Sequence, residues 1–358
     1  MKKIGKILLF VLLAVLAAAI VYVAYVLIAY HRIPDEQPLT AEAGAAERLE
    51  TDTDYTIVSW NIGFGAYESD FGFFMDGGHE SWAWSEERLD ANMEKIGSRL
   101  DGFGADLLLV QEVDTNSTRS YHRDEYALLR QALSGKRYDT TFAVNYDSPF
   151  LFYPFYQPHG HSESGLATFS AFPISSALRR SLPIEESLMK LVDLDRCYCV
   201  NRIPMAGGKE LVLYNFHLSA YTSDGTVAVE QMELLKADMQ KEYEAGNYCI
   251  AGGDFNRDLL GDSSAYFGTA DMEYTWAQPL PEDMFDGVNI SPVSIVDPAH
   301  PVPSCRNADG PYHPGQYVLT VDGFLVTDNV TVGATEVVDT GFANSDHNPV
   351  QMVFRLNG

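Results

Sequence analysis

The hydrophobic positions of the chain form one long apolar run at the amino terminus and many short ones after it. Residues 7–30 contain no charged side chain over 24 positions. At about 1.5 Å of rise per residue, a helix of this length crosses the roughly 30 Å hydrocarbon layer of a membrane. The shorter runs have the lengths of strands and helices in a folded domain. The pattern therefore predicts one membrane-spanning helix followed by a globular part.

The charges that flank the long apolar run predict its orientation. Lys2, Lys3 and Lys6 precede it, whereas residues 31–50 carry two arginines against five acidic residues. Because positive charge is retained in the cytosol, the short tail is expected inside and the folded part outside, as in a single-pass membrane protein with an extracytoplasmic C-terminal domain. A cleaved secretory signal with a site at residues 17–19 is the alternative. The apolar run continues well beyond those alanines, which favours a retained anchor.

The polarity of the chain changes again after this anchor. Residues 31–52 are polar, rich in alanine and glutamate, and contain two prolines, which is typical of a tether. No second linker or internal repeat is found farther along the sequence. We therefore expect a tail and anchor over residues 1–30, a linker over 31–52 and one domain over 53–358.

Short apolar runs bounded by polar residues or glycine predict strands in this domain. They are residues 56–60, 106–111, 140–144, 165–172, 210–216, 248–252, 321–326 and 350–356. Apolar residues at helical spacing predict helices over 85–100, with Ser85 as the N-cap, and over 226–246. Strands buried on one face and covered by helices on the other predict two sheets packed together, with helices outside.

Composition limits the class of protein. There are 24 Lys and Arg against 50 Asp and Glu, so the formal charge is −26, and 46% of residues are hydrophobic. Such a chain can fill a core and is not disordered. Its acidity, without a basic tract, disfavours binding long stretches of nucleic acid by phosphate neutralisation. A small phosphate site that depends on a local cation remains compatible with it.

The four cysteines do not form a metal-binding pattern. Cys197 and Cys199 are two positions apart on an apparent strand, so they share one face and are expected to pack in the core. Cys249 and Cys305 are far apart in the sequence and could pair outside the cell.

Polar side chains able to hold a metal or move a proton stand where the predicted strands end. They are Asn61, Glu112, His217, Asp254, Asn256, Asp322, Asp346 and His347. Carboxylate and amide oxygens suit a hard cation such as Mg²⁺, and the histidines suit proton transfer or phosphate contact. Taken singly, each has an ordinary explanation as a turn former or a hydrogen-bonded core residue. Their joint occurrence and their order distinguish them.

In chain order, the motifs SWN, QE, NFHL, GGDFN, VD and SDH resemble those of the endonuclease/exonuclease/phosphatase superfamily of metal-dependent phosphoesterases. That superfamily includes deoxyribonucleases, apurinic endonucleases, inositol polyphosphate 5-phosphatases and neutral sphingomyelinases. The resemblance covers residues 54–358 and suggests a membrane-anchored, bacterial-type member. It implies an α/β fold, a four-layer α/β sandwich of two mixed sheets with outer helices, and an active site between the sheets.

The resemblance also implies the residues that bind a metal. Asn61 and Glu112 would lie at the ion, with Asp346 near it. The implied cofactor is Mg²⁺, with Mn²⁺ as the alternative. A phosphoester carries negative charge, so hydrolysis needs cations and hydrogen-bond donors directed at its oxygens.

The remaining motif residues are implied to act on protons and phosphate. Asp254 would position or deprotonate the attacking water, and His217 and Asn256 would contact the scissile phosphate. His347 would be oriented by Asp322 as in a carboxylate–histidine pair. Either Asp254 or His347 could be the general base, because such groups titrate together.

Some positions are weaker candidates or depart from the family. Candidates for substrate binding are Arg119, His122 and Asn145, with Tyr121, His159 and His161 as similar candidates. A solvated loop is the ordinary alternative for them. The threonine that commonly precedes the catalytic-loop histidine in the family is Phe216 here, which affects the expected support of His217.

The substrate is less constrained than the chemistry. Aromatic residues in segments 68–84 and 148–156 could line a pocket, lie in a bilayer interface, or form a core under long loops, which is the commonest arrangement. The sequence predicts a tethered, Mg²⁺-dependent phosphoesterase, with a phosphodiester favoured. A sphingomyelin-like lipid and extracellular nucleic acid both remain open as substrates. A non-catalytic binding or scaffolding domain on the same fold is the alternative, and no protein partner can be inferred.

Overall fold

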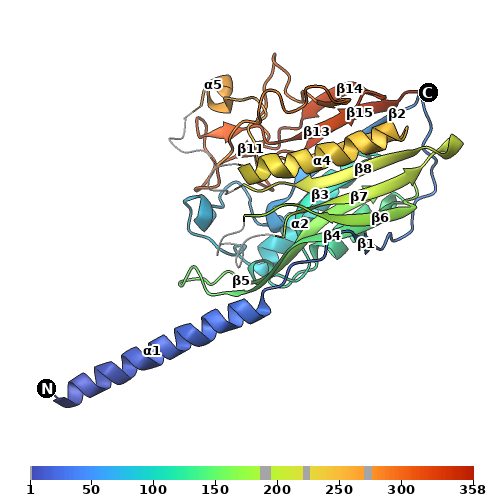
Figure 1. The fold of residues 1–358 in the computed structure, drawn as a ribbon. Coiled ribbons are helices and arrows are strands. Elements are labelled where there is room, and N and C mark those ends of the chain that lie inside the picture. Colours follow the sequence, from blue (N-terminus) through green and yellow to red (C-terminus); the bar gives the residue numbers. More distant parts are fainter. Residues whose placement is uncertain (1, 186–194, 221–225, 270–275) are drawn as a thin grey trace.

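Two large β-sheets packed face to face form the centre of the folded part (Figure 1). The computed structural model describes residues 2–185, 195–220, 226–269 and 276–358. The first sheet contains, in spatial order, β1 (Gln37–Leu39), β6 (Ser176–Ser181), β7 (Cys197–Pro204), β8 (Glu210–His217), β9 (Tyr248–Asp254), β13 (Asp322–Thr327) and β10 (Ile290–Pro292). The second contains β14 (Val330–Val337), β15 (Val350–Leu356), β2 (Asp54–Asn61), β3 (Leu107–Asp114), β5 (Gly160–Ser170) and β4 (Asp139–Leu151). The short strands β11 (Cys305–Arg306) and β12 (Val318–Leu319) form a separate pair.

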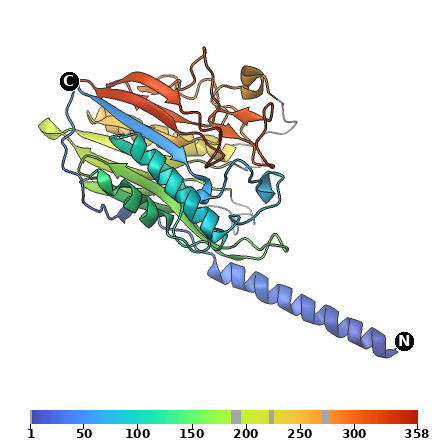
Figure 2. The ribbon, with the colours of Figure 1, turned by 180° about the vertical axis from the view of Figure 1, so that it is seen from behind.

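Helices cover the outer faces of both sheets (Figures 1 and 2). The α-helices are α1 (Lys2–Ala29), α2 (Glu86–Gly102), α3 (Glu125–Ala132), α4 (Thr226–Glu244) and α5 (Ser263–Phe267). The described 3₁₀ turns are η1 (Gly63–Gly65), η2 (Phe74–Asp76), η3 (Thr118–Ser120), η4 (Leu133–Gly135) and η6 (Ala206–Gly208). Helices α2 and α3 pack on the second sheet and α4 packs on the first. The predicted four-layer α/β sandwich is confirmed.

The alternation of apolar residues along each strand explains the layers. In β2, Ile57 belongs to the core between the sheets, whereas Val58 packs under α2 with Ile96. Because successive side chains of a strand point to opposite faces, one strand can serve both layers. Ser85 accepts a hydrogen bond from the Arg88 backbone N–H, so the predicted N-cap of α2 is confirmed.

Two parallel strand pairs determine where the polar strand ends meet. β2 runs parallel to β3, and β8 runs parallel to β9. The carboxyl ends of parallel strands meet at one edge of a sheet. Asn61 and Glu112 therefore lie together in the second sheet, and His217 and Asp254 lie together in the first sheet. β13 is antiparallel to β9 and begins opposite Asp254, at Asp322.

The described part of residues 31–52 differs from the expected tether. β1 pairs with β6 at the edge of the first sheet, and Leu49 is buried against the core between the sheets. β1 was not predicted, because an edge strand tolerates a proline that obscures an alternating pattern, and its neighbour β6 was missed because it carries two arginines. All four cysteines are free and buried, so Cys249 and Cys305 do not pair.

Helix α1 projects from the domain at the side where the β4–β5 hairpin ends (Figures 1 and 2). Most of its apolar residues are exposed, and its length and hydropathy are sufficient for it to cross a membrane. A signal sequence near the N-terminus would have the same properties.

The close approach of the two sheets can be tested at Gly252 in β9. A Cβ at this position would lie 2.7 Å from Leu109 Cδ1 and 2.7 Å from Phe324 Cδ1. We expect Gly252→Ala to lower the free energy of unfolding by about 1–3 kcal/mol, measured by denaturant titration of the full chain in detergent. In the control Gly102→Ala, at the end of α2, the new Cβ meets no atom within 4 Å. An equal loss of stability in both variants would contradict the packing described here.

Candidate active site

The ends of the central strands bring acidic, amide and imidazole side chains together between the sheets. Asn61 ends β2 and Asp254 ends β9, and their side chains are joined across the sandwich by a hydrogen bond of 3.1 Å. His217 ends β8 directly opposite Asp254 in the parallel register. Asp322 begins β13, again opposite Asp254. Four of the predicted site residues therefore meet around one strand end.

The carboxylate of Asp254 is the centre of this group. Its Oδ2 accepts a hydrogen bond from Asn61 Nδ2 and lies 3.4 Å from His217 Nε2 and 3.8 Å from His347 Nε2. Its Oδ1 accepts from the backbone N–H of Asn256. Burial raises the pKa of Asp254 to about 7, against the opposing effect of the nearby His347 ring.

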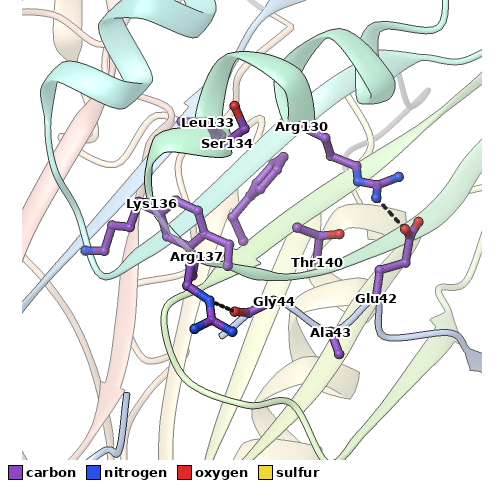
Figure 3. A pocket seen from close by; sticks show the side chains of 11 residues that line it. Glu42, Ala43, Gly44, Arg130, Leu133, Ser134, Lys136, Arg137 and Thr140 are labelled. Atoms are coloured by element: carbon purple, nitrogen blue, oxygen red, sulfur yellow. Dashed lines mark hydrogen bonds and ion pairs between the residues drawn. The ribbon is translucent and has the colours of Figure 1, made fainter. Parts of the chain in front are cut away.

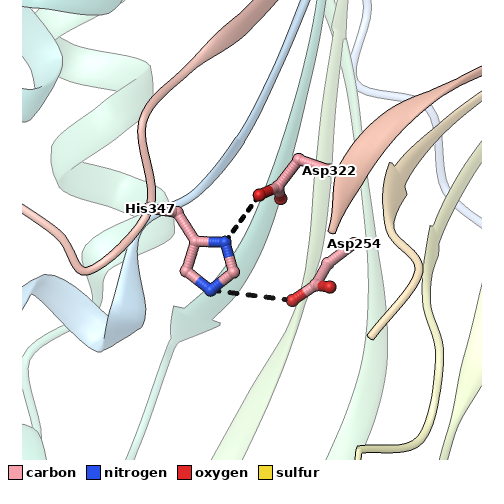
Figure 4. A group of neighbouring side chains, drawn as sticks. All are labelled: Asp254, Asp322 and His347. Atoms are coloured by element: carbon pink, nitrogen blue, oxygen red, sulfur yellow. Dashed lines mark hydrogen bonds and ion pairs between the residues drawn. The ribbon is translucent and has the colours of Figure 1, made fainter. Parts of the chain in front are cut away.

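His347 is held by Asp322 in a buried carboxylate–histidine pair (Figure 4). His347 Nδ1 lies 2.7 Å from Asp322 Oδ2, and this oxygen also accepts from the Ser304 hydroxyl at 2.8 Å. Burial opposes protonation of the ring, but the carboxylate of Asp322 outweighs it and raises the pKa of His347 well above its usual value. Both ring nitrogens thus face carboxylate oxygens, an arrangement that favours the imidazolium form.

The second histidine of the site has the opposite electrostatic environment. His217 is fully buried, and burial together with the cationic Arg196 lowers its pKa well below the usual value. Its Nδ1 has no hydrogen-bond partner among the described residues. A neutral ring that donates from Nε2 toward Asp254 therefore leaves a buried acceptor without a partner inside the site.

Glu112 reaches the site through an irregularity in β3. The register of β3 with β5 shifts between Val110 and Val113, so Glu112 lies in a β-bulge and has a left-handed backbone (φ 54°). Bulges redirect side chains, and strained backbone is found preferentially at functional sites. The Glu112 carboxylate accepts from Asn61 Nδ2 at 3.1 Å, and the Asn61 oxygen accepts from the backbone N–H of Gly63.

The donor set around Glu112 fits a hard divalent cation. The side chain of Asp346 is partly buried, and desolvation together with the neighbouring Glu112 raises its pKa to about 6, although His347 and Arg306 oppose this shift. Two adjacent, partly desolvated carboxylates require a cation to be ionised together. Oxygen donors alone, as Glu112, Asp346 and Asn61 provide, suit Mg²⁺ or Mn²⁺.

A second group of possible ligand atoms comes from Asp254, Asp322 and His347, which lie within 4.8 Å of one another. Here the His347 nitrogen and the Asp322 oxygen already form a hydrogen bond with each other (Figure 4). Because these atoms are engaged with each other, the carboxylates of Glu112 and Asp346 fit a cation better than this second group does.

Two further motif residues support the strand ends. Asn256 has a left-handed backbone (φ 49°), and its side chain donates to the Leu218 carbonyl at 2.7 Å, linking the loops after β9 and β8. Phe216 packs edge-on against Phe255, with ring centroids 4.8 Å apart. An aromatic contact therefore occupies the place where the family commonly has a threonine hydroxyl.

The weaker candidates are dispersed. Arg119 is buried and forms a bidentate ion pair with Asp114, at 2.8 and 2.9 Å, with its guanidinium stacked on Phe64. His122 is exposed and hydrogen-bonded to Asn116. Asn145 is buried at a register shift of β4.

The other weak candidates take part in local contacts. Tyr121 donates to the Ala83 carbonyl, and His161 contacts the carbonyl of Ser148. His159 is buried beside the hydroxyl of Ser81, and burial lowers its pKa to about 3.

The structure adds residues that sequence reasoning missed. Ser304 hydrogen-bonds Asp322, and Cys305 Sγ lies 3.6 Å from His347 Nε2. The Trp60 indole donates to the His347 carbonyl at 2.9 Å. Trp60 stands in the SWN motif, but Ser304 and Cys305 lie in a segment without any recognised pattern.

A cavity of about 530 Å³ lies apart from this site, where residues 42–44 of the connecting segment meet α3, η4 and the start of β4 (Figure 3). Its cationic side chains are already paired. Arg130 contacts Glu42 at 2.5 Å, Arg137 donates to the Gly44 carbonyl, and Lys136 contacts Asp106. Residues 42–44 thus form one wall of this cavity.

The comparison with family models identifies the class of protein. The model of the Endonuclease/Exonuclease/phosphatase family matches residues 58–347. The chain belongs to this family, and the resemblance deduced from its motifs is confirmed. No curated protein matches the chain.

Solved structures share the fold at low identity. An endonuclease/exonuclease/phosphatase from Beutenbergia cavernae DSM 12333 has a TM-score of 0.62 at 19% identity, over 85% of this chain and 72% of that chain. ANGEL2, a 2′,3′-cyclic phosphatase in complex with adenosine-2′,3′-vanadate, has a TM-score of 0.58 at 16% identity, over 88% of this chain and 100% of its own. The human Nocturnin catalytic domain with bound sulfate has a TM-score of 0.53 at 18% identity, over 85% of this chain and 95% of that chain.

The buried environment of Arg119 generates a stability prediction. Because its removal leaves Asp114 as an uncompensated buried charge, we expect Arg119→Ala to lower the free energy of unfolding by about 3–5 kcal/mol. In the control His122→Asn, the exposed position keeps a residue that tolerates the left-handed backbone, and the change should stay within about 0.5 kcal/mol. The free energies of unfolding of both variants are measured by denaturant titration. An Arg119 variant as stable as the control would show that the ion pair between Arg119 and Asp114 does not stabilise the fold.

Proposed function

We propose that the chain is a divalent-metal-dependent phosphoesterase, and that its substrate is a phosphodiester. The observation that carries the proposal is the convergence of Asn61, His217 and His347 on one carboxylate oxygen of Asp254. Family membership supports phosphoester chemistry, and the similarity in fold to a 2′,3′-cyclic phosphatase is consistent with it. A purely structural role for these groups would not require so many buried polar side chains at one point.

Glu112 and Asp346 would hold Mg²⁺, with Mn²⁺ as the alternative, and Asn61 would orient Glu112 or contribute its oxygen. When bound, the ion supplies positive charge at the phosphate and at the leaving oxygen. The adjacency of two partly buried carboxylates supports this proposal.

The proton chemistry belongs to the chain itself. Asp254 would position the attacking water and accept its proton, because its Oδ2 is the acceptor toward which the site converges. His347 would act as a donor, since Asp322 accepts from its Nδ1 and its Nε2 remains directed at the reaction centre. His217 and Asn256 would contact the phosphate oxygens.

We further propose that this chemistry occurs outside the cytosol. The organisation would be a tail and anchor over residues 1–30, a connecting segment over 31–52 and a catalytic domain over 53–358. The lysines before α1 and the acidic residues after it support this orientation. A lipid head group and nucleic acid are the two substrate classes to be separated.

Substitutions in the site test the catalytic proposal. We expect Glu112→Ala, Asp254→Ala and His347→Ala each to reduce turnover of bis(p-nitrophenyl) phosphate by at least about 10²-fold, because each removes a group that acts on the transition state. Glu94→Ala, on the exposed face of α2, is the control. Near-normal turnover by all three folded site variants would reject the enzyme and favour a binding domain.

Removal of the metal tests the cofactor. Treatment with EDTA should abolish hydrolysis, and Mg²⁺ or Mn²⁺ should restore it. Because binding to the folded state alone stabilises it, excess Mg²⁺ at about 100 times its Kd should add about 2.7 kcal/mol to the unfolding free energy of the metal-free protein. Glu112→Gln should lose most of this stabilisation. A chelated protein with full activity would exclude the metal.

A further inference from the structure

The turn between β4 and β5 exposes its aromatic side chains. Residues 148–158, here named the hairpin tip, contain no charged residue. Phe152 is 50% exposed and Phe155 is 75% exposed, with Tyr153 and Tyr156 beside them. The other aromatic segment, 68–84, is largely core, since its Phe71 and Phe73 are buried. A contiguous exposed aromatic surface marks an interaction site.

The hairpin tip lies along the last turns of α1 (Figures 1 and 2). The backbone N–H of Phe150 donates to the Tyr25 hydroxyl, and that of Phe152 donates to the Tyr22 hydroxyl, both at 3.0 Å. The rings of Tyr22 and Phe152 are also in contact, with centroids 6.2 Å apart. From Phe150 to Phe152 the hairpin moves toward its turn, while the partner on the helix changes from Tyr25 to Tyr22, which is nearer the amino terminus of α1. The tip therefore extends toward the amino-terminal end of α1, away from the domain.

The uncharged part of the hairpin and the uncharged part of α1 end at the same place in the structure. His31, the first titratable residue after the apolar run, lies 3.3 Å from Asp147, the last charged residue before the tip. Tyr25 and Tyr22 are 6 and 9 residues before His31 in the sequence. At about 1.5 Å per residue, the tip thus passes about 9 to 14 Å beyond this charged pair.

We infer that the hairpin tip inserts into the outer interfacial layer of the lipid bilayer that α1 crosses. The inference rests on the proposed anchoring by α1. If α1 spans the membrane from Ile7, about 20 residues cross the hydrocarbon and end near Val26, so Tyr22 and Tyr25 lie at the outer boundary. The uncharged tip bonded to them lies at the same depth, where aromatic rings are favoured.

The same insertion directs the proposed active site at the membrane. Three hydrogen bonds tie the tip to residues 79–82, in a loop at the same sheet edge. They join Tyr156 to the His79 carbonyl, Gln157 to the Ser81 N–H and Trp82 to the Pro158 carbonyl. β5 then pairs with β3 next to Glu112. The edge that carries Glu112 is thus held at the level of the head groups, so the substrate class becomes a phosphodiester of a membrane lipid.

The depth of the tip can be measured on the full chain in phosphatidylcholine vesicles. The four native cysteines are buried, so a cysteine introduced as Phe155→Cys can be labelled alone with a polarity-sensitive dye. The matched control is Ala206→Cys, exposed in the turn before β8 and therefore at the sheet edge opposite His217. We expect lipids carrying a nitroxide quencher to reduce the emission at position 155 by about twofold or more, and to leave position 206 unchanged.

Quenching of the dye at position 155 by aqueous iodide but not by the nitroxide lipids would overturn the inference. Protection of this dye from both quenchers would also overturn it and would indicate that a second copy of the chain covers the tip. Tyr153→Cys supplies the same test if the first variant does not fold. The same samples are tested for resistance of the protein to carbonate extraction and for hydrolysis of bis(p-nitrophenyl) phosphate. These two measurements distinguish the absence of insertion at the tip from the absence of anchoring by α1 and from the absence of catalytic activity.

The consequence for the substrate has its own readout. In Phe152→Ser/Phe155→Ser, hydrolysis of vesicle phospholipid should fall about tenfold or more relative to the parent chain, with bis(p-nitrophenyl) phosphate turnover retained. An equal loss on both substrates, or no loss on vesicles, would contradict the assignment of a lipid substrate.

Discussion

The hydrogen bond between Asn61 and Asp254 is the interaction on which the rest of the site depends, because it joins the carboxyl ends of strands from two different sheets. A buried carboxylate is costly unless donors surround it. Asp254 has such donors only where the sheets pack in one relative position. The chemistry of the site is therefore a consequence of the sheet packing, and a slip of one strand by a single residue would turn these side chains to the opposite face.

A polar layer beneath the site helps to hold that relative position. Gln111 precedes Glu112 in β3 and donates to Asn215 in β8 at 2.8 Å, and Asn215 in turn donates to the Ala167 carbonyl in β5. Farther from the site, the sheets meet through apolar side chains such as Leu107 and Leu211. Apolar packing tolerates small shifts, whereas a satisfied network of directed hydrogen bonds between the sheets specifies one arrangement. The contacts between the sheets are apolar far from the site and polar next to it. The polar contacts therefore hold the residues of the site in one relative position.

Sequence reasoning recovered the centre of the fold because central strands must be apolar. β3 and β9 are such strands, and their ends carried the candidates Glu112 and Asp254. It missed β1 and β6, since β1 is an edge strand of only three residues with a proline, and its neighbour β6 carries two arginines that obscure the apolar alternation. The bulge at Glu112 left no pattern either, because it depends on the pairing of β3 with β5. Contacts between distant segments, such as Ser304 with Asp322, arise only from the tertiary fold.

Burial also changed the interpretation of individual charges. Arg119 follows Glu112 closely and has the chemistry of a phosphate ligand, yet its guanidinium is committed to Asp114. Sequence distance alone does not distinguish a free arginine from one that neutralises a buried carboxylate. The paired Arg119 still interacts electrostatically with Glu112.

The net charge explains why membrane attachment would take an apolar form. With a formal charge of −26, the chain is repelled by an anionic lipid surface, and the sequence after the apolar run has no basic tract that would offset this repulsion. Attachment must then come from buried apolar area, and one helix leaves the domain free to rotate about its axis. A second apolar contact at the hairpin tip removes that freedom. Orientation of the site toward the bilayer thus requires the combination of α1 with an uncharged aromatic loop, since neither alone determines which edge of the sandwich faces the lipid.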